Sequence, residues 1–413
     1  MSVNSLPKEI LRRIIALVPD GFDTDPSSWM DNIHRIRGVC RLWREIVITS
    51  PTFFSKILID SRKRPECIQE WLHRSGTTDL TMFFALGCDG EEAVEDYVVI
   101  QDLSDLLTPC MHRCQAIFFH AHTAIGTRLL FGMLNKINAG TVPVLRIEAE
   151  DDFSPHNPRM FAPATARVQH IVAERCALVL LPPSLTTLEL SDLSPDFELT
   201  GTQVRDALSA APGLQYLMVH EVSVFEVEGP RLALPVLSSF NFRCSSVPQA
   251  VFVNILDLPE LCQLVLQVEG DKLFELVAES LNYGSKVVKL NLTISSTGLR
   301  FMRSFFRTMP ELRWLRVADS DELLETTIGA LVLSSPDVFQ SMQRMEFGDN
   351  VDEELVLGIF RGLASVSSSV KVISPVSGVV NEHIKLRCLS MQDGDADKKY
   401  QWVVNGDYWD DVV

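Results

Sequence analysis

The spacing of hydrophobic residues divides the chain into two regions with different periodicities. Over the first sixty residues they recur every three or four positions, as on an amphipathic helix. Ile10, Ile14 and Val18 follow Pro7, and proline is tolerated in the first turn of a helix. The pattern predicts a helix that starts near residue 8, a break over residues 20–28 and a short second helix near residues 33–38.

A third helix is expected in the segment VCRLWREIVITSPTFFSKI, residues 39–57. On this helix Val39, Leu42, Trp43 and Ile46 would form a single apolar stripe. Three helices of this size cannot bury all their aliphatic surface among themselves. We therefore expect the stripe to be buried elsewhere in this chain or against another protein.

From about residue 80 the pattern changes to short strands with the spacing L-x-x-L-x-L, in which the fourth and sixth positions point inward. The matches begin at intervals of 17 to 30 residues, and leucine-rich repeats usually have 20 to 29. In five of them a proline lies two residues before the first apolar position, where a preceding helix would have to end. The matches start at Cys114, Val144, Val168, Leu185, Leu214, Leu237, Leu261, Val287, Leu312 and Met342, and the prolines are Pro183, Pro212, Pro235, Pro259 and Pro310.

Helical stretches over about 272–283, 299–309 and 353–363 fill the intervals between strands. The alternative is a doubly wound α/β domain, but its strands would read as continuous apolar runs, and no phosphate-binding glycine motif is present. The asparagine usual after the last leucine is matched only by Asn350, so the repeats are divergent. The expected fold class is α/β, with a small three-helix module followed by a leucine-rich-repeat solenoid. Such a solenoid has a curved, mostly parallel sheet with helices on its convex side.

Composition and charge narrow the possible partners. The chain has 413 residues, 46% of them hydrophobic, and its 54 acidic and 37 basic residues give a net charge of −17. This charge repels nucleic acid and anionic membranes, so a basic protein partner is favoured. Charged residues interrupt the apolar N-terminus and no long apolar run follows, which predicts a protein of the cytoplasm or nucleus. The nine cysteines are then expected to be buried thiols.

Three segments together resemble the F-box, a three-helix module: LPKEILRRI at residues 6–14, VCRLWR at 39–44 and SPTFFSKILI at 50–59. The resemblance implies that these helices dock the Skp adaptor of a cullin-RING ubiquitin ligase, while the repeats hold a protein substrate and the chain itself is no enzyme. Two features depart from the family: the linker 20–32 is longer than usual, and Phe54 stands where tryptophan is common. The residues carried over as Skp-facing are Leu6, Pro7, Ile10, Leu11, Ile14, Val39, Cys40, Trp43 and Phe53.

For Ile14, Cys40 and Trp43 the alternative role is to hold the three helices together. The expected domains are an F-box over residues 1–60, connecting helices and a first irregular repeat over 61–110, repeats over 111–373, and a C-terminal cap or tail over 374–413.

The substrate surface is expected where side chains alternate with the buried apolar ones, at the third, fifth and seventh positions of each strand. Early strands place Glu148, Glu150, Glu174 and Glu189 there, and later strands place cations and aromatic residues there. This sorting predicts a protein substrate that is basic or carries an acidic or phosphorylated motif. Tyr216 and Met218 lie between the acidic and the basic group. The predicted substrate-binding residues are Tyr216, Arg243, Lys289, Trp314, Arg316 and Arg344.

Cys110, His112, Cys114, His120 and His122 lie close together in the sequence, but they lack the paired spacing of zinc sites. We expect no metal, no cofactor and no catalytic residue. Two alternatives stay open. One is a leucine-rich-repeat scaffold that is not coupled to ubiquitination; the other is an enzyme with a distant thiol nucleophile, which predicts an exposed cysteine of low pKa near a histidine.

The C-terminal tail is acidic and carries two local signals. Asp393, Asp395 and Asp397 imitate the start of a calcium loop that then lacks its glycine and its glutamate. Residues 399–412 alternate around Asn405-Gly406, a signal for a β-hairpin with a type I′ turn. We expect the hairpin to cap the last repeat, and the alternative is that it shields the basic surface.

Overall fold

The computed structural model describes residues 6–17, 26–60, 65–86, 105–121, 142–149, 168–175, 181–192, 199–281, 286–294, 299–317, 322–347, 359, 362 and 371–373. The chain divides into two compact units. Unit 1 comprises Met1–Phe197 with Asp206–Ala211, and unit 2 comprises Glu198–Arg205 with Pro212–Val413.

Unit 1 begins with three helices: α1 (Lys8–Ala16), α2 (Pro26–Val39) and α3 (Arg41–Thr49). The expected short helix over 33–38 was wrong in length, because α2 begins at Pro26 and takes up residues 26–28 of the expected break and 26–32 of the expected linker. Proline is well suited to a first helical position, and α2 then buries Trp29, Ile33 and Ile36, which share one face. Residues 26–32, which were expected to form part of a linker, therefore belong to a helix that contributes to the core of unit 1.

The strands of unit 1 form a parallel array in the order β1-β2-β3-β4-β5-β6. Two of them, β1 and β2, precede residue 111, where the repeats were expected to begin. Helix α4 (Pro65–Arg74) follows β1, and a 3-10 turn, η3 (Thr108–Arg113), leads into β3. The strands are β1 (Lys56–Asp60), β2 (Leu80–Leu86), β3 (Cys114–Ala121), β4 (Val144–Ala149), β5 (His170–Glu174) and β6 (Thr187–Ser191).

The strand pattern of the sequence holds, with exceptions in β6 and β4. In β6 the sixth position, Leu190, is only half-buried. In β5 the buried residues are Val168, Ile171 and Ala173, as the L-x-x-L-x-L frame predicts. In β4 the expected start at Val144 was wrong: the buried triplet is Val142, Leu145 and Ile147, so the frame begins two residues earlier. Because side chains alternate with a period of two, Glu148 stays on the half-buried side as expected, whereas Val144, expected as the first buried position, also lies on that side.

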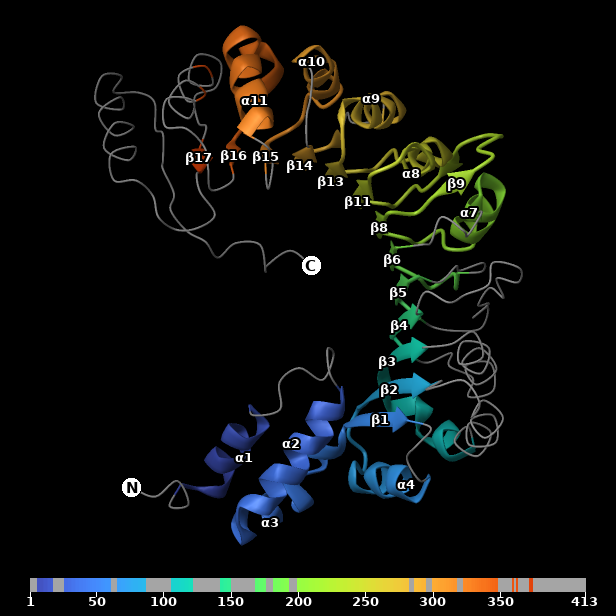
Figure 1. Ribbon diagram of the computed structural model, residues 1–413, viewed down its shortest axis with the longest axis vertical. Coiled ribbons are helices and arrows are strands. Elements are labelled where there is room, and N and C mark those ends of the chain that lie inside the picture. Colours follow the sequence, from blue (N-terminus) through green and yellow to red (C-terminus); the bar gives the residue numbers. More distant parts are fainter. Residues whose placement is uncertain are drawn as a thin grey trace. The chain divides into compact units, whose positions relative to one another are not determined.

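The strands of unit 2 are also parallel, in the order β8-β11-β13-β14-β15-β16-β17. Helices α8 to α11 lie on one side of these strands, between successive strand ends and starts (Figure 1). The expected helices near 272–283 and 299–309 are confirmed as α9 (Asp271–Ser280) and α10 (Leu299–Arg307). Of the expected helix 353–363, residues 359 and 362 are helical and the others lie outside the described residues.

The remaining elements of unit 2 have the following bounds. The strands are β8 (Tyr216–His220), β11 (Ser239–Cys244), β13 (Gln263–Val268), β14 (Lys289–Ile294), β15 (Trp314–Val317), β16 (Arg344–Glu346) and β17 (Lys371–Ile373). Two short strand pairs are β7 (Leu199–Thr200) with β9 (Val224–Phe225), and β10 (Leu232–Ala233) with β12 (Leu256–Asp257). The helices are α7 (Gly201–Ser209), α8 (Val247–Ala250), η4 (Val251–Ile255), α11 (Glu322–Ser334) and η6 (Pro336–Phe339).

Buried phenylalanines fill the space between the strands and the helices of unit 2. Phe242 stacks on Phe252 of η4 with ring centroids 6.3 Å apart, and Phe274 of α9 meets Phe305 of α10 edge to face at 5.0 Å. Such offset and edge-to-face arrangements are the favoured geometries of aromatic pairs. The chain is thus an α/β protein of the solenoid-like repeat type, with long parallel sheet structure and packed helices.

Each strand presents two sides with different environments. One side carries the buried triplets, and the other, called the polar face, carries the alternating, half-buried residues. After β5, β6 and β8 the chain turns through a non-glycine residue with positive φ, namely Arg175, Asp192 and Glu221. Left-handed backbone at these positions costs roughly 1 kcal/mol each, which the packed repeats must offset.

Candidate binding surfaces

Helix α1 has two apolar stripes, and only one of them is buried. Leu11 and Ile15 have no exposed surface, whereas Ile10, Ile14 and Leu17 are 42%, 37% and 75% exposed. At about 100° per residue the three exposed residues fall within an arc of about 60°. The outer stripe of α1, Ile10, Ile14 and Leu17, is therefore a continuous aliphatic strip on the surface of unit 1.

The register of α1 on α3 is supported by an ion pair. Lys8 Nζ lies 2.7 Å from Glu45 Oε1 of α3, and its hydrogen bond and charge lower the pKa of that carboxyl. The contact is fully solvated, so it orients the helix more than it stabilises it. The buried side of α1 faces α3, and the outer stripe consequently faces away from it.

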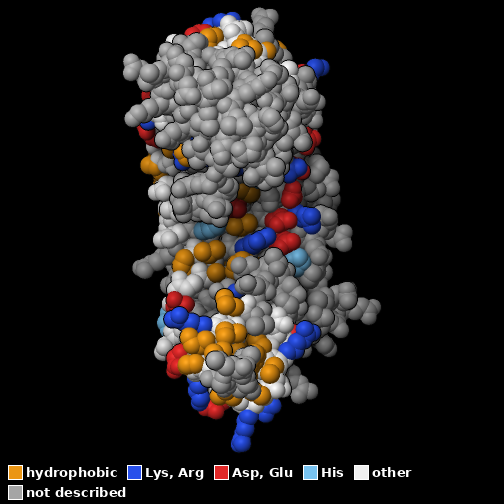
Figure 2. Space-filling view, turned by 90° about the vertical axis from the view of Figure 1, so that its left-hand side faces the viewer, with side chains coloured by type: hydrophobic (Ala, Val, Ile, Leu, Met, Phe, Trp, Pro, Cys, Tyr) orange, Lys and Arg blue, Asp and Glu red, His pale blue; other side chains and the backbone are white. Residues whose placement is uncertain are grey.

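The predicted Skp-facing residues divide into three groups. Leu11 and Phe53 are buried and hold the helices together, so in this structure they offer no surface to a partner. Cys40 and Trp43 are half-buried, and Leu6, Pro7, Ile10, Ile14 and Val39 are exposed. The sequence analysis missed Leu17 and Ile48, which are also exposed. Figure 2 shows hydrophobic side chains gathered over the N-terminal helices, in the lower part of the view.

The polar face of unit 2 is organised in rows, because residues in register on neighbouring parallel strands lie side by side. In the first row Gln263, Lys289, Trp314 and Arg344 are consecutive register partners across β13 to β16. In the second row, two residues further along each strand, the partners are Val265, Asn291, Arg316 and Glu346. Neighbouring members of a row are separated by about 4.8 Å.

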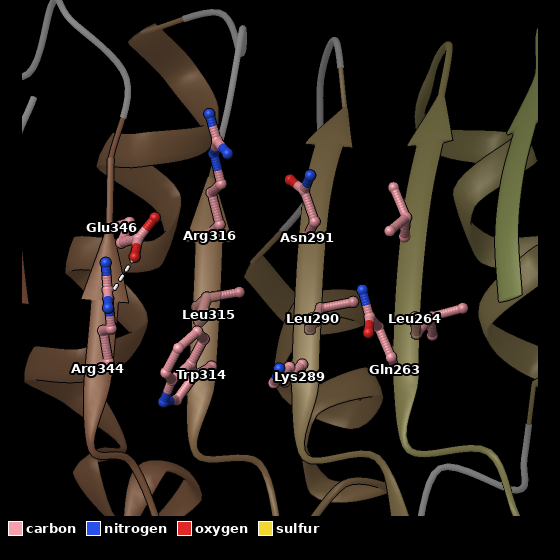
Figure 3. A pocket seen from close by; sticks show the side chains of 11 residues that line it. Gln263, Leu264, Lys289, Leu290, Asn291, Trp314, Leu315, Arg316, Arg344 and Glu346 are labelled. Atoms are coloured by element: carbon pink, nitrogen blue, oxygen red, sulfur yellow. Dashed lines mark ion pairs between the residues drawn. The ribbon is translucent and has the colours of Figure 1, made fainter. Parts of the chain in front are cut away.

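Trp314 sits between two cations of the first row. Lys289 Nζ lies 4.9 Å from the centre of the Trp314 ring, and Arg344 Cζ lies 4.7 Å from it. Both distances are within the range of cation–π attraction. In Figure 3 the indole ring is placed between these two side chains, with Arg316 and Asn291 further along the strands. The same residues line a small pocket whose floor is formed by Leu264, Leu290 and Leu315.

Two further features of this pocket were missed in the sequence. Glu346 is 6% exposed and forms an ion pair with Arg344 Nε. Among the described residues, Asn291 Oδ1 is a buried amide oxygen without a hydrogen-bond partner. An alternation rule places Asn291 and Glu346 on the polar face but gives no reason to single them out; only the register between strands does so.

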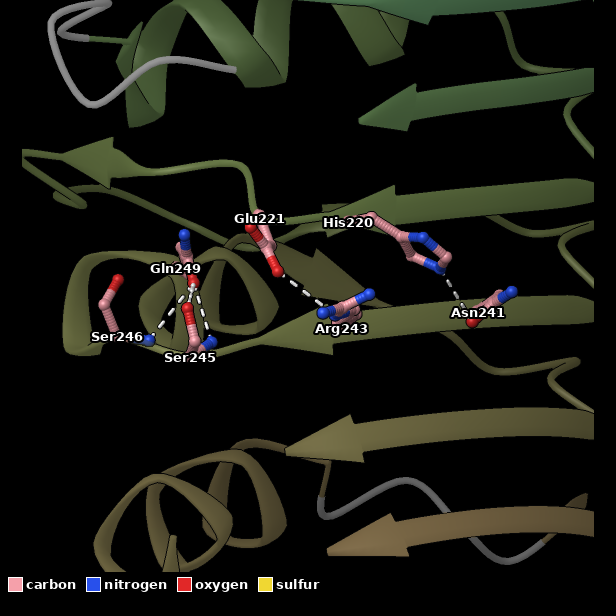
Figure 4. Close-up of polar contacts among 7 residues, drawn as sticks. All are labelled: His220, Glu221, Asn241, Arg243, Ser245, Ser246 and Gln249. Carbon is pink, nitrogen blue, oxygen red and sulfur yellow. Dashed lines mark hydrogen bonds and ion pairs between the residues drawn. The ribbon is translucent and has the colours of Figure 1, made fainter. Parts of the chain in front are cut away.

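Arg243 and Tyr216, the other predicted substrate residues, lie apart from the pocket. Arg243 belongs to a third row and its Nε lies 3.1 Å from Glu221 Oε1, while His220 Nε2 lies 3.2 Å from Asn241 Oδ1 (Figure 4). Tyr216 shares the first row, separated from Lys289 by Ser239 and Gln263. The structure thus brings together Lys289, Trp314, Arg316 and Arg344, and leaves Arg243 in an ion pair.

The polar face of unit 1 carries carboxylates and imidazoles. His120 Nδ1 lies 3.4 Å from Glu148 Oε2, and His170 Nε2 lies 3.1 Å from Glu189 Oε1. Glu174, in register with Glu148, has its pKa raised by burial and secondarily by the Glu148 charge. Arg146 Nη2 lies 3.8 Å from Glu174 and opposes this effect in part. Glu150 lies outside the described residues.

The cysteine and histidine cluster is dispersed. His112 Nδ1 lies 2.8 Å from the Pro109 carbonyl oxygen, and Cys110 Sγ accepts a hydrogen bond from Arg113 Nη2 at 3.8 Å. Within the described ranges no group of three or more His, Cys, Asp or Glu side chains is arranged around a common point. His122, the calcium-like segment 393–397 and the expected hairpin 399–412 lie outside these ranges.

The described cysteines differ in their exposure to solvent. Cys67 and Cys262 are exposed, Cys40 and Cys110 are intermediate, and Cys114 and Cys244 are buried. Burial raises the pKa of Cys114 and of Cys244 to about 12, which makes both poor nucleophiles. The expectation that the cysteines are buried thiols therefore holds for Cys114 and Cys244 and is wrong for Cys67 and Cys262.

No protein-family model matches the sequence, and no curated protein matches it. Among solved structures, the crystal structure of a Bacteroides fragilis protein aligns over 81% of this chain and 77% of its own length, at a TM-score of 0.36 and 14% sequence identity. A likeness at this level carries no information about function. Among the described helices, none combines the length and the apolar composition needed to cross a bilayer.

Proposed function

We propose that this protein is a non-catalytic substrate-recognition subunit of an Skp-cullin-F-box ubiquitin ligase. In this proposal the N-terminal helices are an F-box that docks the Skp adaptor, and the strands are divergent leucine-rich repeats that hold a protein substrate. The observation that carries it is the outer stripe of α1, an aliphatic surface in the segment whose sequence resembles the F-box.

The physical argument starts from the energy of exposed aliphatic surface. Burying the exposed part of such an isoleucine or leucine against a partner stabilises a complex by roughly 1 to 2 kcal/mol. Ile10, Ile14 and Leu17 form one strip, and Val39 and Ile48 add exposed aliphatic surface on α2 and α3. Single exposed hydrophobic residues are common, but a contiguous strip of this kind is typical of a docking surface.

The contribution of such a subunit to ubiquitination is proximity. A substrate held on the repeats, while the helices hold the adaptor, is kept near the ubiquitin-conjugating enzyme, which raises the effective concentration of its lysines. This role requires two separate surfaces and no catalytic group. The outer stripe of α1 and the polar face of unit 2 are two such surfaces, one in each unit.

The test is a pull-down of purified Skp adaptor with the full chain. Ile10→Glu with Ile14→Glu should reduce adaptor affinity by at least about 2 kcal/mol, or about thirtyfold, because two apolar anchors are replaced by charges. The matched control is Leu276→Glu with Phe301→Glu, residues of α9 and α10 that are 40% and 37% exposed. It makes the same change in net charge and in exposed apolar surface, and should bind the adaptor normally.

A melting curve of each variant accompanies the pull-down. Because Ile10 and Ile14 are exposed, the stripe variant should melt within a few degrees of the unmodified chain. Equal adaptor binding by both double variants would refute docking through α1. The pull-down is then repeated with cullin added; if the adaptor binds through the stripe but no cullin is recovered with the complex, the alternative of a scaffold outside ubiquitination is the correct one.

A further inference from the structure

We propose that the polar face of β14 to β16 binds a short extended peptide segment that carries carboxylate or phosphate groups. The surface is named the Trp314 site and consists of Lys289, Asn291, Trp314, Arg316 and Arg344. This inference rests on the proposed function in one respect, since the peptide is taken to be part of the substrate. The binding chemistry itself follows from the side chains.

The spacing of the cations suits an extended chain that crosses the strands. Lys289 and Arg344 are both register partners of Trp314, so they lie two strands apart, a separation of about 9.6 Å. A peptide in the extended polyproline II conformation rises about 3.1 Å per residue with three residues per turn, so its positions i and i+3 lie about 9.3 Å apart on the same side. Acidic groups at positions i and i+3 of such a peptide would therefore reach the two ends of the row together.

Trp314 organises the cations as well as separating them. With Lys289 and Arg344 each near its ring, the indole holds both side chains in place, so less side-chain entropy is lost when an anion binds. Glu346 engages Arg344 through Nε. A guanidinium has five N–H donors, so four remain on the terminal nitrogens for a second acceptor.

The second row adds a polar group of a different kind. Asn291 and Arg316 are register partners one level further along β14 and β15 (Figure 3). An amide in this position can rotate to present N–H donors to an anion or its oxygen to a peptide N–H. Arginine is the side chain best suited to bidentate recognition of carboxylate and phosphate.

The extent of the surface favours a short motif over a long polyanion. The three cations are confined to three neighbouring strands, and the carboxylate of Glu346 lies directly beside them. Nucleic acid presents one charge per about 1.7 Å and is bound by many phosphate contacts at once. The net charge of −17 would repel such a polymer, whereas a motif with two or three charges interacts mainly within the Debye length of about 8 Å.

The experiment measures fluorescence polarisation of labelled heptapeptides with the full chain, in the absence of any adaptor. Four peptides differ only at positions two and five, which carry Glu, phosphoserine, Gln or Lys. The proposal predicts that the Glu peptide, the phosphoserine peptide or both bind at least about tenfold more tightly than the Gln and Lys peptides, with affinity that falls as salt is raised. Equal binding of all four peptides would overturn it.

Charge-reversed variants locate the binding. Lys289→Glu with Arg316→Glu should lower the affinity for the acidic peptides by about tenfold or more. The matched control is Lys272→Glu with Arg303→Glu, exposed residues of α9 and α10, which changes the net charge equally at another surface. An equal loss in both variants would show that only the overall charge matters and would refute the site. Should the first variant melt early, Lys289→Gln with Arg316→Gln replaces it.

Two competitors test whether the site binds a peptide, a free anion or a nucleic acid. If the site recognises a peptide and not a free anion, an unlabelled copy of the phosphoserine peptide should displace the labelled one. Inorganic phosphate should do so only at far higher concentration. A single-stranded oligothymidylate that binds as tightly as the peptides, and is lost in the same variant, would contradict the proposal. The adaptor pull-down should be unchanged by Lys289→Glu with Arg316→Glu, so failure of this inference and failure of adaptor docking are distinguishable.

Discussion

The polar faces of β3 to β6 in unit 1 and of β13 to β16 in unit 2 have the same backbone geometry and opposite chemistry. Both sets of strands are parallel, and apart from Leu190 of β6 they bury their side chains at the same positions of the repeat. In unit 1 the alternating positions hold His120, Glu148 and Glu174 in one register row. In unit 2 the corresponding kind of row holds Lys289, Trp314 and Arg344.

The difference shows which positions determine the fold and which are free to vary. The apolar triplets supply the burial that forms each strand, and the half-buried residues between them add little to it. The two rows also differ in how side chains of like charge are spaced. Glu174 lies beside Glu148 and has a raised pKa, whereas the two cations of the first row in unit 2 are separated by an aromatic ring. The second arrangement keeps both charges available to a ligand.

The strongest test of this comparison is to truncate one buried phenylalanine in the core of each unit. Phe119 of β3 and Phe242 of β11 are buried, and each stacks on another phenylalanine, at 5.4 Å and 5.6 Å. Phe119→Ala and Phe242→Ala should each lower the free energy of unfolding by about 3 to 5 kcal/mol. Urea unfolding followed by circular dichroism measures both.

The control is Phe118→Ala, the neighbour of Phe119 on the polar face, where Phe118 stacks on Phe83. Because this residue is only half-buried, the expected loss is about 1 kcal/mol. A loss at Phe118 as large as that at Phe119 would show that the two sides of the strand are not distinct in energy, and the comparison would fail.

Much of the fold could be predicted from the sequence because its signals are local. Alternation of apolar residues, and the prolines that precede five of the predicted strands, are visible within ten residues, and this local pattern placed most of the strands and the helices α9 and α10. Helix α2 was mispredicted because polar and turn-forming residues surround Pro26, while its apolar face is completed only by packing of Trp29 against the rest of unit 1. Tertiary packing overrode the local signal there.

For the candidate sites, the alternation of side chains along each strand predicts which face a residue lies on and nothing more. Alternation placed Lys289, Trp314, Arg316 and Arg344 on one face, and the structure brings them together. It could not distinguish them from Arg243, whose ion pair with Glu221 depends on the turn after β8. For α1 the spacing identified the apolar residues but not which of its two stripes is buried, since that depends on where α3 lies.

A sharper test concerns Glu346, the carboxylate of the second row that pairs with Arg344. Glu346→Gln leaves Arg344 without its ionic partner in a largely buried setting, so the free energy of unfolding should fall by about 1 to 3 kcal/mol. At the same time the affinity for the acidic heptapeptides should rise, because a competing negative charge is removed. Stability and peptide binding thus change in opposite directions, which a general loss of structure would not produce.

The matched control for Glu346 is Glu221→Gln. Glu221 also pairs with an arginine, Arg243, but the pair is more exposed and lies away from the pocket. Its loss should cost no more than about 1 kcal/mol and should leave peptide binding unchanged. If both variants gain affinity equally, the acidic peptides respond to net charge and the role of Glu346 is refuted.

The smallest expected effect concerns the acidic row of unit 1 and its dependence on pH. Burial, and then the Glu148 charge, raise the pKa of Glu174 above its usual 4.5, so the folded state disfavours the ionised carboxylate. Well below pH 4.5 the group is protonated in both the folded and the unfolded chain, and no penalty exists. As the pH rises through 4.5 and then through the raised folded value, the unfolded chain releases its proton first, so this residue lowers stability over that interval.

Glu174→Gln should therefore be slightly more stable than the unmodified chain near neutral pH, and the difference should vanish in acid. The carboxylate is partly solvated, and its contact with Arg146 at 3.8 Å is also lost in the variant, so the gain should stay below about 0.5 kcal/mol. Urea midpoints measured at several pH values give the difference, with Glu279→Gln on the exposed side of α9 as control. A variant that is less stable than the unmodified chain at neutral pH would mean that the attraction of Arg146 outweighs burial and Glu148. The acidic row would then be a compensated ion-pair network, and the contrast with the Trp314 site would lie only in the sign of its charges.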